Sequence, residues 1–257
     1  MTGLRYVPAA LLITAALLAA TCRRAGPLRN LPDEMAASIP SDTIALAGLH
    51  LDQIRDTDFY QGLPAGWLTT LEPLQQATNL LLASNGKDLL AIARGRFSAP
   101  PAGGTLLTPN LALAGSAAAV RAATAQHARG LHEATSLLAE AGAITEKPVW
   151  LIAEGGHSLP LTGNFANLNT LLGLTKFATL TADFESGVHI EVAALCPTSD
   201  TARQLEEKLR AIMTLAQATS HDRDIIATLQ SVDLQREDST VHLHLATTAV
   251  ALEKLVR

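Results

Sequence analysis

The chain has 257 residues, of which 48% are hydrophobic and 17% are charged, and its formal net charge is −5 at pH 7. A mildly acidic chain without clusters of Lys and Arg is unlike nucleic-acid-binding proteins, which use arrays of cationic side chains against phosphates. Aromatic residues make up only 4%, which argues against stacking platforms for bases or sugars. We therefore expect no nucleic-acid partner.

The N-terminal residues predict where the protein goes. Arg5 is followed by an uncharged run from Tyr6 to Thr21 and then by Cys22. A basic start, an apolar run and small residues before a break are typical of a secretion signal. We predict a signal peptide over residues 1–21, lipidation of Cys22, and a protein anchored at the periplasmic side of the cell envelope.

Two alternatives to a lipoprotein remain open. A lipoprotein signal favours Leu three residues before the cysteine and Gly, Ala or Ser directly before it, whereas this chain has Ala19 and Thr21 at these positions. An ordinary cleaved signal is therefore one alternative. Arg23 and Arg24 follow at once, and positive charge hinders translocation of that flank. An uncleaved inner-membrane anchor is the other alternative, although residues 6–22 would span only roughly 25 Å as a helix.

Behind the signal, residues 22–42 contain several prolines and predict a tether. Residues 43–146 and 147–257 then follow a similar plan, with a strand, a helical segment, a hairpin and a later helix in each. We predict an α+β fold in which antiparallel β-hairpins and sheets are covered on one face by amphipathic helices. The two parts are interpreted as similar subdomains.

In the first part, Asn85-Gly86 between two apolar runs predicts a β-hairpin, because both residues tolerate positive φ. Asp52 is expected to cap a helix after the first strand, and Ser116 to cap another. The expected segments are strands at 44–51, 80–83, 89–94 and 111–114, a loop at 98–104, and helices at about 66–78, from 116, and at 131–141.

In the second part, residues 188–195 alternate between apolar and polar side chains, which predicts a strand with one wet face. The clearest helix begins near residue 198, with Arg203–Glu207 and Glu206–Arg210 pairs on its outer face and an apolar stripe of Leu205, Leu209, Ile212 and Ala216. The other expected segments are strands at 149–153, 177–184, 232–235 and 240–245, and helices at 164–172 and 250–256.

One grouping of side chains suggests chemistry. His242 and His244 flank Leu243 on an expected strand, so both imidazoles would lie on one face. Two histidines in this arrangement can supply two ligands of a metal site from one strand. His189, with Glu191 beside it, would complete the site if the two strands pair. This is the basis of an alternative function, a metal-dependent hydrolase.

Other polar groupings are interpreted as structural. Cys196 ends an apolar strand and is expected to be a small buried hydrophobe. The residues around Ser158 do not meet the Gly-x-Ser-x-Gly pattern of a nucleophile turn. Turns, caps and solvated helix ends account for the remaining groupings: Asp56 with Asp58, Gly86-Lys87, and His127 with His132 and Glu133.

Several short segments carry a resemblance to a known family. They are 39–43, 47–48, 53–60, 93–97, 159–161, 164–169 and 200–203. In these the chain resembles an uncharacterised family of exported proteins from Acidobacteria, over most of the mature length. The family's activity is unassigned, so the resemblance implies export and no functional residues. The segment 77–79 is abbreviated relative to the family pattern.

No spacing in the sequence matches what catalysis demands, so no catalytic residue is assigned and no cofactor is expected. We expect a non-catalytic binding or structural module that uses a sheet edge or the groove between the two parts. Its expected partners are the membrane, through the N-terminal anchor, and another envelope protein.

Overall fold

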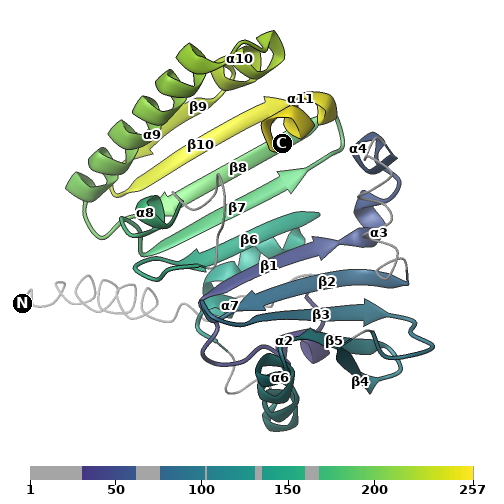
Figure 1. Cartoon of the computed structure of the whole chain (residues 1–257). Coiled ribbons are helices and arrows are strands. Elements are labelled where there is room, and N and C mark those ends of the chain that lie inside the picture. Colours follow the sequence, from purple (N-terminus) through teal and green to yellow (C-terminus); the bar gives the residue numbers. More distant parts are fainter. Residues whose placement is uncertain (1–30, 62–75, 102, 131–134, 160–167, 257) are drawn as a thin grey trace, which may run out of the picture.

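Ten strands pair antiparallel in a single sheet, and helices lie against it (Figure 1). This computed structural model describes residues 31–61, 76–101, 103–130, 135–159 and 168–256. The predicted α+β class is confirmed. The strands are β1 (Ala45–His50), β2 (Ala77–Ser84), β3 (Leu89–Gly95), β4 (Gly104–Thr108), β5 (Leu111–Gly115), β6 (Val149–Glu154), β7 (Phe177–Asp183), β8 (Val188–Leu195), β9 (Asp233–Glu237) and β10 (Thr240–Thr247).

The helices differ widely in length. The longest is α9 (Ser199–Thr219), and Thr198 caps it by accepting a hydrogen bond from the Thr201 amide. The others are α2 (Asp33–Ala36), α3 (Leu51–Ile54), α4 (Asp58–Gln61), α6 (Ala117–Arg129), α7 (Leu137–Ala141), the 3₁₀ turn η3 (Gly142–Glu146), α8 (Leu168–Leu172), α10 (Arg223–Gln230) and α11 (Ala249–Val256). None of the helices within the described ranges is long and apolar enough to cross a membrane.

The strand order is the same in both halves of the sheet. Across the sheet it runs β4-β5-β3-β2-β1-β6-β7-β8-β10-β9. Outward from the centre, the first half therefore reads β1, β2, β3, β5, β4, and the second half reads β6, β7, β8, β10, β9. The junction between the halves lies between η3 and β6, where the sequence divides at residues 146 and 147. The two parts share one continuous sheet.

Strands β1 and β6 join the two halves at the centre. Gly48 lies opposite Trp150 in their register. The Trp150 side chain is 1% exposed, and a Cβ at Gly48 would lie 2.1 Å from its Cε2 atom. Glycine is therefore required here, because the indole ring occupies the space that any other side chain would need.

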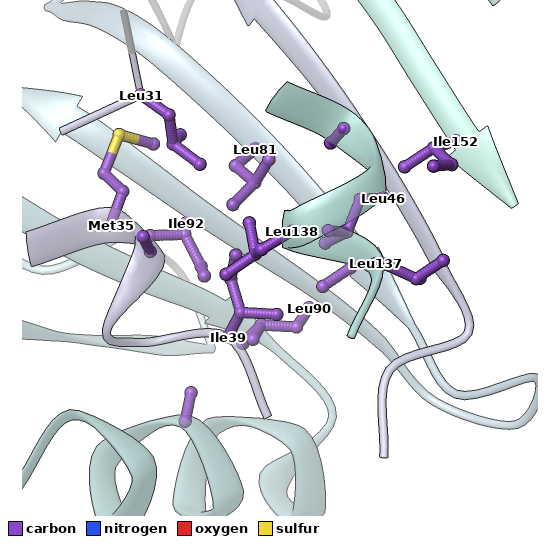
Figure 2. Close-up of a cluster of buried hydrophobic side chains, with 14 of the residues drawn as sticks. Leu31, Met35, Ile39, Leu46, Leu81, Leu90, Ile92, Leu137, Leu138 and Ile152 are labelled. Atoms are coloured by element: carbon purple, nitrogen blue, oxygen red, sulfur yellow. The ribbon is translucent and has the colours of Figure 1, made fainter. Parts of the chain in front are cut away.

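The main core lies against one face of the first half. Figure 2 shows Leu46, Leu81, Leu90 and Ile92 of the sheet meeting side chains from the helical segments. Those helical side chains are Leu31, Met35, Ile39, Leu137 and Leu138, from α2 with its flanks and from α7. Ala119 and Ala123 of α6 belong to the same cluster, as do Trp150 and Ile152 of the neighbouring strand β6.

Residues 31–42 therefore correct the predicted tether. Met35 and Ile39 are 0% exposed and belong to the core, so this segment is part of the folded protein. Its prolines flank a helix of a single turn and do not keep it extended. A tether predicted over 22–42 ends before Leu31, and residues 22–30 lie outside the described part.

In the second half, the packed helices lie on the opposite face of the sheet. Ala202 and Leu205 of α9 pack against Ala194, Leu234 and Val241. In register, Ala194 lies beside Ala178, which lies beside Ala153, which lies beside Ala45. Side chains alternate along a strand, so these residues face away from Leu46 and the main core.

Helices therefore cover both faces, although the sequence analysis expected one covered face. The physical reason is an insertion: α9 and α10 enter between β8 and β9, whereas the equivalent β3–β4 connection carries no helix in its described residues. A third cluster on the α9 face of the first half contains Leu51, Ala77, Leu80, Ala93 and Ala112.

All the predicted hairpins are confirmed, including the one at Asn85-Gly86.

Other elements differ from the expectation. Strand β4 and helix α10 were not predicted. Ile212, which was expected in the apolar stripe of α9, is 49% exposed. Asp52 lies in the first turn of α3 and does not cap it. Ala77 and Thr78, expected at the end of a helix, begin β2. Residues 66–75 of that predicted helix and parts of those at 131–141 and 164–172 lie outside the described residues.

Glu206 links α9 to the edge strand β9. Its carboxylate accepts hydrogen bonds from Arg210 Nη2 at 2.8 Å and from Arg236 Nε at 3.0 Å. The hydrogen bond from Arg210 is the main cause that lowers the pKa of Glu206, with Arg236 acting in the same direction against partial desolvation.

We predict that Gly48→Ala lowers the free energy of unfolding by about 1–3 kcal/mol, because the added methyl group overpacks the buried indole. Chemical denaturation measures this change. Gly142→Ala is the control, since a Cβ there meets no atom within 4 Å. In a Gly48→Ala, Trp150→Leu double variant the two losses should be less than additive. Fully additive losses would show that the indole is not the obstacle.

We predict that Glu206→Gln lowers stability at pH 7 and that this difference from wild type disappears in acid. A carboxylate with a lowered pKa stabilises the fold above its ordinary pKa of about 4.3. That stabilisation is lost as the pH falls through the lowered value in the folded state. Urea unfolding between pH 7 and pH 3 measures it. Glu207→Gln, whose partner Arg203 is exposed, is the control, and an equal effect in both variants would contradict the prediction.

Candidate functional site

The three predicted metal-ligating histidines do come together on one sheet face. Strand β8 pairs with β10, with Glu191 opposite His244 and His189 opposite Ala246. Cross-strand partners share a face, so His189, His242 and His244 lie on the same surface, as predicted. This surface continues the face that carries the main core, beyond the point where α2, α6 and α7 cover it.

The imidazoles are not arranged as a metal site. The distance from His244 Nδ1 to Glu191 Oε1 is 4.0 Å, and both side chains are more than half exposed. His189 Nε2 instead lies 3.2 Å from Ser186 Oγ in the adjacent turn. Among the described residues, no group of three or more His, Cys, Asp or Glu side chains could hold a metal ion. The geometry thus gives the hydrolase alternative no support.

A serine–histidine pair with a buried serine was not predicted from the sequence. Ser38 Oγ lies 2.9 Å from Nδ1 of the half-buried His127, which joins the residues that follow α2 to α6. Ser38 also donates to the Glu34 carbonyl at 2.8 Å, so its oxygen accepts the hydrogen from His127. A nucleophilic serine requires the reverse direction, with the hydroxyl donating to the imidazole. Ser38 is 0% exposed, so the pair is a structural contact.

His50 is also held in a structural role. Its Nε2 lies 2.8 Å from the Thr145 carbonyl, and its Nδ1 lies 2.7 Å from Nδ2 of Asn79. The carbonyl accepts and the amide donates, which assigns the neutral tautomer with hydrogen on Nε2. Both ring nitrogens therefore have partners, and His50 fastens the end of β1 to η3 and β2.

Cys196 confirms the interpretation of a buried hydrophobe. It is 1% exposed and belongs to the cluster beneath α9. Burial raises the pKa of its thiol, which keeps the sulfur protonated and unreactive. Cys22, the predicted lipidation site, lies outside the described residues.

The centre of the opposite face carries a row of apolar side chains. Leu151, Leu180 and Val192 lie side by side on β6, β7 and β8, and Ile190 and Leu245 lie side by side on β8 and β10. We call these five residues the central apolar face. All five are half-buried, and none belongs to the three buried clusters built from described residues.

The flanks of the central apolar face are packed. On one side Leu49 and Leu82 pack against the cluster that contains Leu80. On the other side Leu243 packs against the cluster beneath α9. The five residues thus form an apolar strip between two packed regions. A sequence signal was present, because residues 149–153 are apolar on both faces, but the strand order was needed to place these residues beside β8 and β10.

Comparison with models of protein families found no match, and neither did comparison with curated proteins. Among solved structures, the chain is similar to two crystal forms of TP0453. The TM-score is 0.51 for both, with 9% and 10% sequence identity, over 86% of this chain and 96% of the other. This likeness supports the α+β fold alone. The resemblance to exported Acidobacterial proteins stays a prediction.

Proposed function

We propose that the protein is a non-catalytic binding module of the cell envelope that takes up an apolar ligand on the central apolar face. One observation carries the proposal: five half-buried aliphatic side chains lie side by side across β6, β7, β8 and β10. Covering exposed apolar surface is favourable by about 25 cal/mol per Å². A contiguous apolar patch on a folded protein therefore marks a binding surface.

The polar groups of the described residues support binding over catalysis. Ser38 donates its hydroxyl hydrogen to a carbonyl, and both nitrogens of His50 are engaged. The exposed His244 and Glu191 lie on the other face of the sheet, away from the central apolar face. An apolar surface without a nearby nucleophile or acid–base pair suits recognition.

The proposed location rests on the N-terminal sequence. Cleavage before Cys22 and lipidation of its thiol would anchor the folded part at the periplasmic surface of a membrane. Leu31, the first described residue, already belongs to the core, so at most nine residues, 22–30, separate the proposed anchor from the core. This would hold the binding module close to the membrane surface.

We predict that Leu180→Thr weakens binding of the uncharged dye N-phenyl-1-naphthylamine by roughly fivefold or more. Burying a leucine side chain fully gains roughly 2 kcal/mol, so a half-buried leucine that the dye covers contributes about 1 kcal/mol to dye binding. Because about 1.4 kcal/mol corresponds to a tenfold change in affinity, losing this contribution weakens binding roughly fivefold. Fluorescence titration of the full chain measures the change.

Leu215→Thr is the matched control, because Leu215 is a 65% exposed leucine on α9 and is not one of the five residues of the central apolar face. It should leave dye binding unchanged. If both variants weakened dye binding equally, or if Leu180→Thr left the affinity for the dye unchanged, the proposed surface would be overturned. Unfolding curves for each variant show that the comparison is made on folded protein.

We predict that protein isolated from its native membrane lacks residues 1–21 and carries acyl chains on Cys22. Intact mass spectrometry measures both features, and Cys22→Ser should abolish the modification. Cys196→Ser, which changes a buried thiol, should leave the acyl mass in place. An unprocessed chain would favour the uncleaved anchor, and a cleaved chain without acyl groups would favour an ordinary signal.

A further inference from the structure

The turn between β2 and β3 holds an Asn-Gly pair that the proposed function does not use. Asn85 is the only asparagine in the chain that is followed by glycine. Both residues are partly exposed to solvent, and Gly86 has a φ of 87°. The backbone nitrogen that follows an asparagine can close a five-membered ring with the side-chain carbonyl carbon. Glycine leaves this nitrogen unshielded, because it has no Cβ.

The side-chain amide of Asn85 is oriented by hydrogen bonds at both of its ends. Its Oδ1 accepts from the backbone amide of Lys87 at 3.1 Å and from that of Asp88 at 2.9 Å. Its Nδ2 donates to Oδ2 of Asp42 at 3.0 Å. The Asn85 side chain therefore joins the turn to the segment that precedes β1, and its carbonyl oxygen faces two backbone donors.

The two donors at Oδ1 lie where negative charge develops during ring closure. When the Gly86 nitrogen adds to Cγ of Asn85, the carbonyl oxygen becomes an oxyanion, and N–H donors about 3 Å away stabilise such a charge. The Lys87 and Asp88 amides are at this distance from the oxygen. The turn therefore stabilises the tetrahedral intermediate of ring closure.

From this geometry we propose that Asn85 is a site of spontaneous deamidation and that the carboxylate formed there loosens the turn from Asp42. The Gly86 nitrogen loses its proton to solvent hydroxide and forms a bond to Cγ of Asn85. The bond from Cγ to Nδ2 breaks, and the leaving nitrogen takes a proton from water and departs as ammonia, which leaves a succinimide. Water then opens the ring at either carbonyl. The net reaction consumes one water, releases one ammonia and leaves aspartate or isoaspartate at position 85.

Deamidation changes the contact with Asp42 from attractive to repulsive. An aspartate at position 85 keeps one oxygen for the Lys87 and Asp88 amides, because a carboxylate oxygen accepts hydrogen bonds as an amide oxygen does. The atom that donated to Asp42 across 3.0 Å becomes an acceptor, so two negative charges face each other. Asp88 of the same turn accepts a hydrogen bond from Ser116, the N-cap of α6. The altered turn is therefore the one that contacts both the start of α6 and the segment before β1.

The inference is independent of the proposed apolar binding surface. Incubation of the full chain at pH 8 and 37 °C, followed by peptide mapping with mass spectrometry, measures conversion at each asparagine. We expect Asn85 to convert at least about tenfold faster than Asn110, because the side chain of Leu111 shields the nitrogen that follows Asn110. Asn110 is the matched internal control, since it is exposed in the turn between β4 and β5. Equal rates at the two positions, or no conversion at Asn85, would overturn the inference.

The variant Asn85→Asp tests the structural consequence, because it reproduces the aspartate product. At pH 7 it should raise the equilibrium constant of unfolding in urea at least about fivefold, the effect of losing a hydrogen bond to a charged group. Asn110→Asp adds the same charge in an exposed turn and should leave that constant unchanged. In an Asp42→Asn background the hydrogen bond is restored in the opposite direction, so Asn85→Asp should have little effect. Equal effects of Asn85→Asp with and without Asp42, or of Asn85→Asp and Asn110→Asp, contradict the proposed role of Asp42.

Discussion

The pairing of β1 with β6 is the contact on which the rest of the structure depends. It joins two five-stranded halves into one sheet, and its register sets Gly48 opposite Trp150. The indole lies over a glycine because only a residue without a side chain leaves room for it. Outward from this central pair the strands of both halves follow the same order, in which the last strand of each half (β5 or β10) lies inside the strand before it (β4 or β9).

The two halves share their strand order but not their helices. In the first half α2, α6 and α7 cover one face, and in the second half α9 covers the other. Because the helices cover opposite faces of the two halves, part of each sheet face is not covered by a helix among the described elements. One such part carries the exposed His244 and Glu191 with the half-buried His189 and His242, and the other carries the central apolar face. The difference between these two surfaces follows from the alternation of side chains along the same strands.

Buried polar side chains, cationic side chains and apolar surface side chains thus lie in different parts of the structure. The buried Ser38 and His50 form hydrogen bonds with the half-buried His127 and Asn79, and these contacts fasten a helix and a strand end. Three arginines, Arg55, Arg94 and Arg96, lie around a pocket where β2 begins and β3 ends, and the apolar strip lies in the middle of the sheet. The apolar strip in this arrangement is suited to recognition of an apolar body.

The sequence by itself determined the local elements. Asn85-Gly86 predicts its hairpin because both residues tolerate positive φ, and Gly86 indeed has a φ of 87°. Alternation along 188–195 predicts a strand with one wet face, and Ser116 predicts the start of α6. These signals act between residues close in the chain, so they do not depend on the fold. The tether was wrongly extended to residue 42 because the burial of Met35 and Ile39 depends on strands far away in the chain.

Only the tertiary structure decided which surfaces are covered and which residues meet. The sequence placed His189, His242 and His244 on strands, and strand pairing put them on one face, yet their side chains do not converge. The central apolar face draws on four strands, and the pocket that is lined by Arg55, Arg94 and Arg96 joins residues from position 55 to position 110. Neither could be read from local patterns, because strand order and the face chosen by each helix are set by long-range packing of apolar surface, which periodicity along the chain does not encode.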